Sequence, residues 1–185
     1  MALRSLLPFA LCPLAFAAQI HEAARSNAVA NLEALGADLD RDLNLPEPGS
    51  GQTPLMAATL AGADRSVALL LARGADATIP EKDGYTPFHG AGFQGRAEVA
   101  ELLFEHKLDP SHRHKDGYTP LHRACWGNEP RHTQMVRFLV RKAGVDPEEA
   151  GPSGKTCLDM TQNPGTRKLI AKRIEKKRRA AGGEL

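Results

Sequence analysis

Apolar residues recur at helical spacing through the middle of the chain, between short polar turns. Val99, Leu102 and Leu103 lie at positions i, i+3 and i+4, the spacing that gives a helix one apolar face. Just before them, residues 90–92 are Gly-Ala-Gly, which are small enough to let neighbouring helices approach closely. Residues 83–84 form an Asp-Gly dipeptide that is typical of a turn. The pattern therefore predicts pairs of short helices separated by hairpin-like loops.

A motif that begins with threonine repeats along the chain. TPLMAA begins at Thr53, TPFHGA at Thr86, TPLHRA at Thr119 and TCLDMT at Thr156, so the copies are 33, 33 and 37 residues apart. Proline is favoured at the first position of a helix, and the threonine before it can cap the helix. A single unit of this size cannot bury its apolar face, so stacking of the units must form the core.

These residues resemble the ankyrin repeat, a helix–turn–helix unit with Thr-Pro-Leu-His at the start of its first helix. The resemblance covers about residues 20–179 and implies a mostly α fold, an ankyrin-repeat solenoid of stacked helix-turn-helix units with hairpin-like loops. It divides the chain into a degenerate N-terminal repeat with a long loop (18–52), repeats at 53–85, 86–118 and 119–155, the last with an insertion, a degenerate C-terminal capping repeat (156–179) and a disordered tail (180–185).

The copies depart from the repeat pattern at a few positions. Lys107 stands one period after Gly74, at a helix end that prefers a residue tolerant of positive φ, so we expect strain or local remodelling there. The four extra residues of the 119–155 copy fall as three around residues 128–130 and one at Ala143. The connection from residue 38 to residue 53 is rich in proline and glycine, which predicts an extended, mobile loop.

The N-terminus has the pattern of a secretory signal peptide. One arginine precedes an apolar run at residues 5–17, which ends in Ala-Phe-Ala, a small-x-small cleavage site. We therefore predict a signal peptide at residues 1–17 and a place in the secretory pathway or outside the cell, with cytoplasm or nucleus and plastid as alternatives. Cleavage would remove Cys12, and Cys125 and Cys157 lie in different repeat contexts, so the sequence offers no argument for a disulfide. On this interpretation the cysteines do not support an oxidising destination.

Composition fits a soluble protein, but the charge is unevenly distributed. The 185 residues are 42% hydrophobic and 25% charged, with a formal net charge of +2. Residues 167–179 hold eight basic residues and one acidic residue, which leaves 16 basic and 21 acidic residues elsewhere. Leu169, Ile170 and Ile174 give this segment an apolar edge, which favours a capping helix whose charged face is solvated. The alternative is that this basic helix binds nucleic acid or an anionic surface.

Neither enzyme chemistry nor a cofactor is predicted. Residues 151–156 end like a phosphate-binding loop, but Glu149 stands where that motif needs glycine, and the repeat explains the segment fully. In ankyrin repeats the histidine at the position of His89 and His122 braces the turn through hydrogen bonds. His112 and His114 could begin a metal site, but no further ligand is placed to complete it, so no metal is expected.

Aromatic residues are the strongest functional signal. Tyr85 and Tyr118 are one period apart, as are Leu60, Phe93 and Trp126. In the ankyrin family these two columns and the loop tips line the concave face that usually grips partners; the alternative is that the aromatics pack on the next repeat. We therefore predict a monomeric, non-enzymatic protein-protein interaction module, a scaffold or adaptor without a transmembrane segment and with nucleic acid an unlikely partner. Its expected contact residues are Leu60, Tyr85, Phe93, Gln94, Tyr118 and Trp126, with Lys82, Arg113, His114 and Lys115 as a basic rim.

Overall fold

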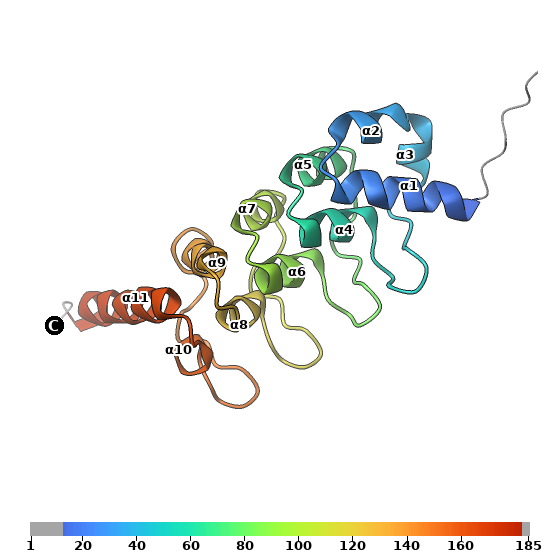
Figure 1. The fold of residues 1–185 in the computed structure, drawn as a ribbon. Coiled ribbons are helices and arrows are strands. Elements are labelled where there is room, and N and C mark those ends of the chain that lie inside the picture. Colours follow the sequence, from blue (N-terminus) through green and yellow to red (C-terminus); the bar gives the residue numbers. More distant parts are fainter. Residues whose placement is uncertain (1–12, 183–185) are drawn as a thin grey trace, which may run out of the picture.

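The computed structural model describes residues 13–182, and within them helices stack in two rows (Figure 1). The first helix of each unit lies in one row and the second helix in the other, while the loops between units project together past the first row (Figure 1). The helices are α1 (Pro13–Arg25), α2 (Val29–Ala34), α3 (Ala37–Arg41), α4 (Pro54–Ala61), α5 (Asp64–Ala72), α6 (Pro87–Gln94), α7 (Ala97–Glu105), α8 (Pro120–Cys125), α9 (Pro130–Arg141), α10 (Cys157–Met160) and α11 (Pro164–Gly182). This arrangement confirms the predicted mostly α solenoid of stacked helix-turn-helix units.

The Thr-Pro motif starts the first helices as predicted. Thr53 caps α4, because its hydroxyl accepts a hydrogen bond from the backbone N–H of Met56 at 3.2 Å. Thr119 starts α8 with a capping box. The Thr119 side chain accepts a hydrogen bond from the backbone N–H of His122, and the His122 side chain accepts one from the backbone N–H of Thr119. Proline occupies the first turn of α4, α6 and α8, where its missing N–H costs nothing.

The small residues of α6 permit the close approach that their pattern predicts. A Cβ atom at Gly92 would lie 2.5 Å from the carbonyl oxygen of Pro120, at the start of α8. At Gly90 a Cβ would meet the side-chain ends of Leu60 and Met56 on α4, at 3.1 and 3.3 Å. Helix α6 therefore packs closely against both α4 and α8, and its Phe88 is fully buried in the core.

Two departures from the repeat have clear structural outcomes. Lys107 adopts φ +65°, the left-handed conformation that Gly74 adopts one unit earlier at φ +86°, so the predicted strained joint is confirmed. In the 119–155 repeat, α9 begins at Pro130 and is twelve residues long, against nine in α7. The second helix of this repeat is therefore about one turn longer, and the connection before it is also longer, at residues 126–129 against residues 95–96 before α7.

The N-terminal repeat is more ordered than the sequence suggested. The segment from residue 38 to residue 53 is not simply extended, because α3 occupies its first part and Leu39 and Leu43 are buried. Glu47 forms an ion pair with Arg25 of α1 at 2.6 Å, which fixes the middle of the segment. Residues 1–12 of the predicted signal peptide lie outside the described residues, and the predicted cleavage point after Ala17 falls within α1, before the buried Ile20.

The C-terminal cap, α10 and α11, packs against the last complete repeat. Leu169, Ile170 and Ile174 of α11 are buried, as their spacing predicts for a capping helix. The helix continues to Gly182, so residues 180–182 of the predicted disordered tail are helical.

A disulfide joins Cys125 to Cys157, a bond for which the sequence offered no argument. Helices α8 and α10 are in contact, and the Cα atoms of the two cysteines lie 5.5 Å apart, although the two residues hold different positions in their repeats. The structure therefore pairs two cysteines for which the sequence predicted no bond.

Candidate partner-binding face

Arg123 gathers three of the predicted aromatic residues into one cluster on the face formed by the first helices and the loop tips. Its guanidinium carbon lies 4.8 Å from the ring centroid of Tyr85, 5.3 Å from that of Tyr118 and 4.7 Å from that of Trp126. A guanidinium at these distances is attracted to the aromatic ring electrons. Only 6% of Arg123 is exposed. The two predicted aromatic columns therefore meet around a cation that the sequence pattern did not single out.

Polar contacts fix the orientation of Arg123. Its guanidinium forms an ion pair with Asp116 and donates a hydrogen bond to the hydroxyl of Tyr85 at 3.2 Å. Partial burial raises the pKa of the Asp116 carboxyl, but hydrogen bonds from His114 and Arg123 outweigh that effect and hold this pKa at about 2. The carboxylate is therefore charged at neutral pH and holds the guanidinium among the rings.

His114 does not lie on the rim where the sequence placed it. Its ring stacks on Tyr85 with 4.0 Å between centroids, its Nε2 is 3.0 Å from the carbonyl oxygen of Asp83, and only 5% of the residue is exposed. Successive loops pack on one another, so this side chain is inserted between two loops instead of facing solvent. The His114 ring therefore packs against the Tyr85 ring and helps to fix its position.

The other predicted rim residues are exposed. Lys82 and Lys115 are exposed at the loop tips. Arg113 is also exposed but forms an ion pair with Glu149 of the next loop at 2.6 Å. The rim therefore offers two lysines and one arginine that already has a carboxylate partner.

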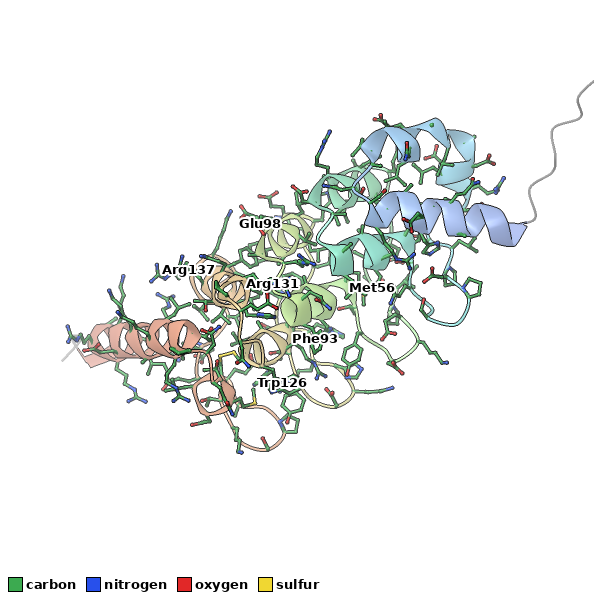
Figure 2. All side chains as sticks on the ribbon, viewed as in Figure 1. Met56, Phe93, Glu98, Trp126, Arg131 and Arg137 are labelled. Atoms are coloured by element: carbon green, nitrogen blue, oxygen red, sulfur yellow. A yellow bond between two sulfur atoms is a disulfide. The ribbon has the colours of Figure 1, made fainter. Side chains whose placement is uncertain are left out.

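A groove of about 360 Å³ runs between the first helices and the loops. Its walls include Met56 and Leu60 from α4, Phe93 and Gln94 from α6, Tyr85 from the loop before α6, and Arg123. Phe93 is 57% exposed, and Trp126, which follows α8, is 39% exposed (Figure 2). Such large exposed apolar side chains on neighbouring units are typical of contact surfaces. Four predicted contact residues, Leu60, Tyr85, Phe93 and Gln94, thus line one groove.

Acidic groups stand on the loop side of the groove. Glu81 and Asp83 are both part of its wall. The Glu81 carboxylate accepts backbone hydrogen bonds from Asp83 at 3.1 Å and Tyr85 at 3.2 Å, which fixes the loop. The groove is therefore apolar on its helix side and polar on its loop side.

The repeat histidines brace the turns as the resemblance implied. In His122, Nδ1 lies 2.7 Å from the Thr119 hydroxyl, and Nε2 lies 3.2 Å from the carbonyl oxygen of Glu149. His89 Nδ1 lies 2.9 Å from the Thr86 hydroxyl. Burial, assisted by the positive charges nearby, lowers the pKa of His89 to about 4, so the ring is neutral at physiological pH. These rings are structural parts of the loops.

Some basic residues of helix α11 form ion pairs with acidic residues of the same chain. Lys177 forms ion pairs with Asp146 at 2.8 Å and Glu148 at 3.3 Å, and Arg178 pairs with Glu148 at 2.9 Å. These contacts tie α11 to the preceding loop. Nucleic-acid or anionic-surface binding by this helix gains no support from the arrangement.

Residues 13–182 contain no group of three or more side chains placed to hold a metal ion. Within the same range, no helix combines the length and apolar character required to cross a membrane.

Paired helices, projecting loops and a groove along the first helices define a repeat solenoid. A family model for ankyrin repeats, in three copies, matches residues 20–114 and, in an overlapping second match, residues 64–151. The chain therefore belongs to the ankyrin-repeat family, whose members are generally protein–protein interaction modules and typically lack enzymatic activity. A comparison with curated proteins gave no match.

Proposed function

We propose that this protein is a non-enzymatic scaffold or adaptor that binds a protein partner on the concave face formed by its first helices and loop tips. The observation that supports this most strongly is the exposure of Phe93, which lines the groove, together with that of Trp126 one period later on the following unit. Burying two such side chains in a partner would supply the apolar anchors that dominate protein interfaces. Ankyrin repeats are generally protein–protein interaction modules, so membership of this family supports a protein as the partner.

The aromatic cluster would serve as a rigid wall of the interface. Arg123 holds Tyr85, Tyr118 and Trp126 in fixed positions, so these rings lose little conformational freedom when a partner binds. Lys82 and Lys115 at the loop tips would add contacts at the solvated edge, where charges affect association rate and specificity more than affinity.

A capture experiment with matched variants tests the proposal. The parent protein and a Phe93→Ala/Trp126→Ala variant are immobilised and exposed to extract from the native cell, and recovered proteins are quantified by mass spectrometry. Leu45→Ala is the control, because Leu45 is 38% exposed and does not line the groove. We expect a partner that the parent and Leu45→Ala recover equally and the double variant recovers at least tenfold less. Equal recovery by a double variant with parental circular dichroism would contradict the proposed site.

A further inference from the structure

The disulfide lies at the junction between the last complete repeat and the cap. Cys125 is the last residue of α8 and Cys157 is the first residue of α10. Both residues are fully buried, and the bond closes a chain segment with a sequence separation of 32. It is therefore a covalent connection between two stacked units of the solenoid.

Besides the disulfide, the cap is held by the buried side chains of α11 and by Asn163, whose side-chain amide donates hydrogen bonds to the carbonyl oxygens of Gly127 at 3.4 Å and Glu129 at 3.1 Å, so α10 is its weakest part. Helix α10 is only four residues long, and its Leu158 is only half-buried. The ion pair between Lys177 and Asp146 joins side chains that are 49% and 52% exposed, and such pairs contribute little to stability. A terminal unit of a solenoid packs on one side alone, so it is the unit that opens most readily.

We propose that the disulfide between Cys125 and Cys157 locks the cap onto the last complete repeat and that the chain acquires it in a thiol-oxidising compartment. Because both cysteines are fully buried once the cap is docked, an oxidant cannot reach them in the folded protein. The bond therefore forms while α10 is still undocked, and burial afterwards protects it from reductants. This is a permanent connection and not a rapidly reversible switch.

The oxidant is a disulfide donor, either a dithiol–disulfide oxidoreductase in its oxidised form or glutathione disulfide. The thiolate of one cysteine attacks the donor's disulfide and forms a mixed disulfide, releasing one donor sulfur as a thiolate. The thiolate of the second cysteine then attacks the chain's sulfur in the mixed disulfide, which forms the Cys125–Cys157 bond and releases the second donor sulfur. Overall the two thiols lose two electrons and two protons, and the donor gains them as two thiols.

A second observation points to the same kind of compartment. Disulfides persist in secretory and extracellular environments, whereas the cytosol keeps thiols reduced. The predicted signal peptide at residues 1–17 is a separate feature of the sequence that also predicts export. Its removal would take Cys12 away and leave a mature chain with two cysteines, both paired.

Docking of the cap also supports the aromatic cluster. A Cβ at Gly151 would lie 2.8 Å from Cε1 of Tyr118, so the backbone of the loop before α10 packs directly on that ring. Tyr118 in turn contacts Trp126, with 5.0 Å between ring centroids. Loss of the disulfide would therefore loosen the end of the face on which Tyr118 and Trp126 lie.

The first test traps thiols in the native cell. Cells are quenched in acid, and the full-length gene product, in whatever processed form the cell contains, is unfolded and alkylated with and without prior reduction before peptide mass spectrometry. We expect Cys125 and Cys157 to be alkylated only after reduction and their peptides to be recovered joined. Alkylation of both residues without reduction would overturn the proposal.

The second test measures what the bond does to the cap. In the oxidised parent, reduction under mild denaturing conditions should lower the unfolding temperature by about 10 °C. Hydrogen exchange should rise first at residues 150–182 and leave α4–α7 protected. The Cys125→Ala/Cys157→Ala variant is the matched control, and its unfolding temperature should be the same with and without reductant. Equal unfolding temperatures and exchange for the oxidised and reduced parent would contradict a locking role. No readout involves a partner, so these outcomes are independent of the proposed binding function.

Discussion

The guanidinium carbon of Arg123 lies 4.7 Å from the ring centroid of Trp126, and the same side chain forms an ion pair with Asp116. A charged residue that is almost fully buried is stable only when its charge is paired, as it is here. The arginine therefore connects a loop carboxylate to an exposed aromatic residue on the proposed binding face. It makes the aromatic cluster part of the folded structure and not a set of independent surface residues.

Replacing Arg123 with methionine should destabilise the protein by about 2 kcal/mol, because the three ring contacts and the hydrogen bond to Tyr85 are lost. Urea unfolding followed by circular dichroism measures the change. Arg137→Met on α9 is the control, since Arg137 is exposed, and its effect should stay within about 0.5 kcal/mol. Equal effects of the two substitutions would show that the ring contacts of Arg123 contribute nothing.

Gly92→Ala should destabilise the protein by roughly 1–3 kcal/mol. The new methyl group would lie 2.5 Å from the Pro120 carbonyl oxygen, and backbone cannot move aside as a flexible side chain can. Gly90→Ala in the same helix meets only the side-chain ends of Leu60 and Met56, and it should be neutral or slightly stabilising. Thermal unfolding of both variants tests the difference. A Gly92→Ala variant as stable as Gly90→Ala would contradict the close contact between α6 and α8.

Lys107→Gly should stabilise the protein by about 0.5–1 kcal/mol. Glycine adopts φ +65° without steric cost, although its flexible unfolded state offsets part of the gain. Lys107→Ala keeps a Cβ at this position and should gain nothing, which separates backbone strain from loss of the lysine charge. Urea titration measures the free energies of unfolding of both variants. A Lys107→Gly variant less stable than Lys107→Ala would argue against strain at this joint.

Stability should fall between pH 7.5 and pH 5 because of His89. Its pKa is lowered from 6.5 to about 4 in the folded protein, so between these values the unfolded chain binds more protons. The stabilisation is therefore complete above pH 6.5 and is lost as the pH falls toward 4, by roughly 2 kcal/mol at pH 5. Urea unfolding at both pH values measures the loss, and an NMR titration of the His89 ring checks its origin. A titration midpoint near 6.5 would contradict the burial effect.

Features that depend on a short stretch of sequence were predictable. The helix starts at Thr53 and Thr119, the strained joint at Lys107 and the close approach at Gly92 each follow from local residues and the repeat period. The 33-residue period by itself also aligns Leu60, Phe93 and Trp126 in one column.

Features that join several units were missed. Arg123 was not singled out in the sequence, because its three aromatic partners come from two loops and the end of α8. His114 was expected on the rim because nothing local shows that it inserts behind Tyr85. The pairing of Cys125 and Cys157 was missed for a similar reason, since the two residues hold different positions in their repeats.

Site-specific photo-crosslinking tests the binding proposal most directly. A photoreactive phenylalanine analogue such as benzoylphenylalanine replaces Phe93 in one form of the protein and Leu45 in another, and both are irradiated in extract from the native cell. Both positions are exposed, but only the first lines the groove. The account predicts a discrete covalent adduct with one protein from position 93 and no such adduct from position 45. Absence of any adduct at position 93, or the same adducts at both positions, would contradict a partner-binding site on this face.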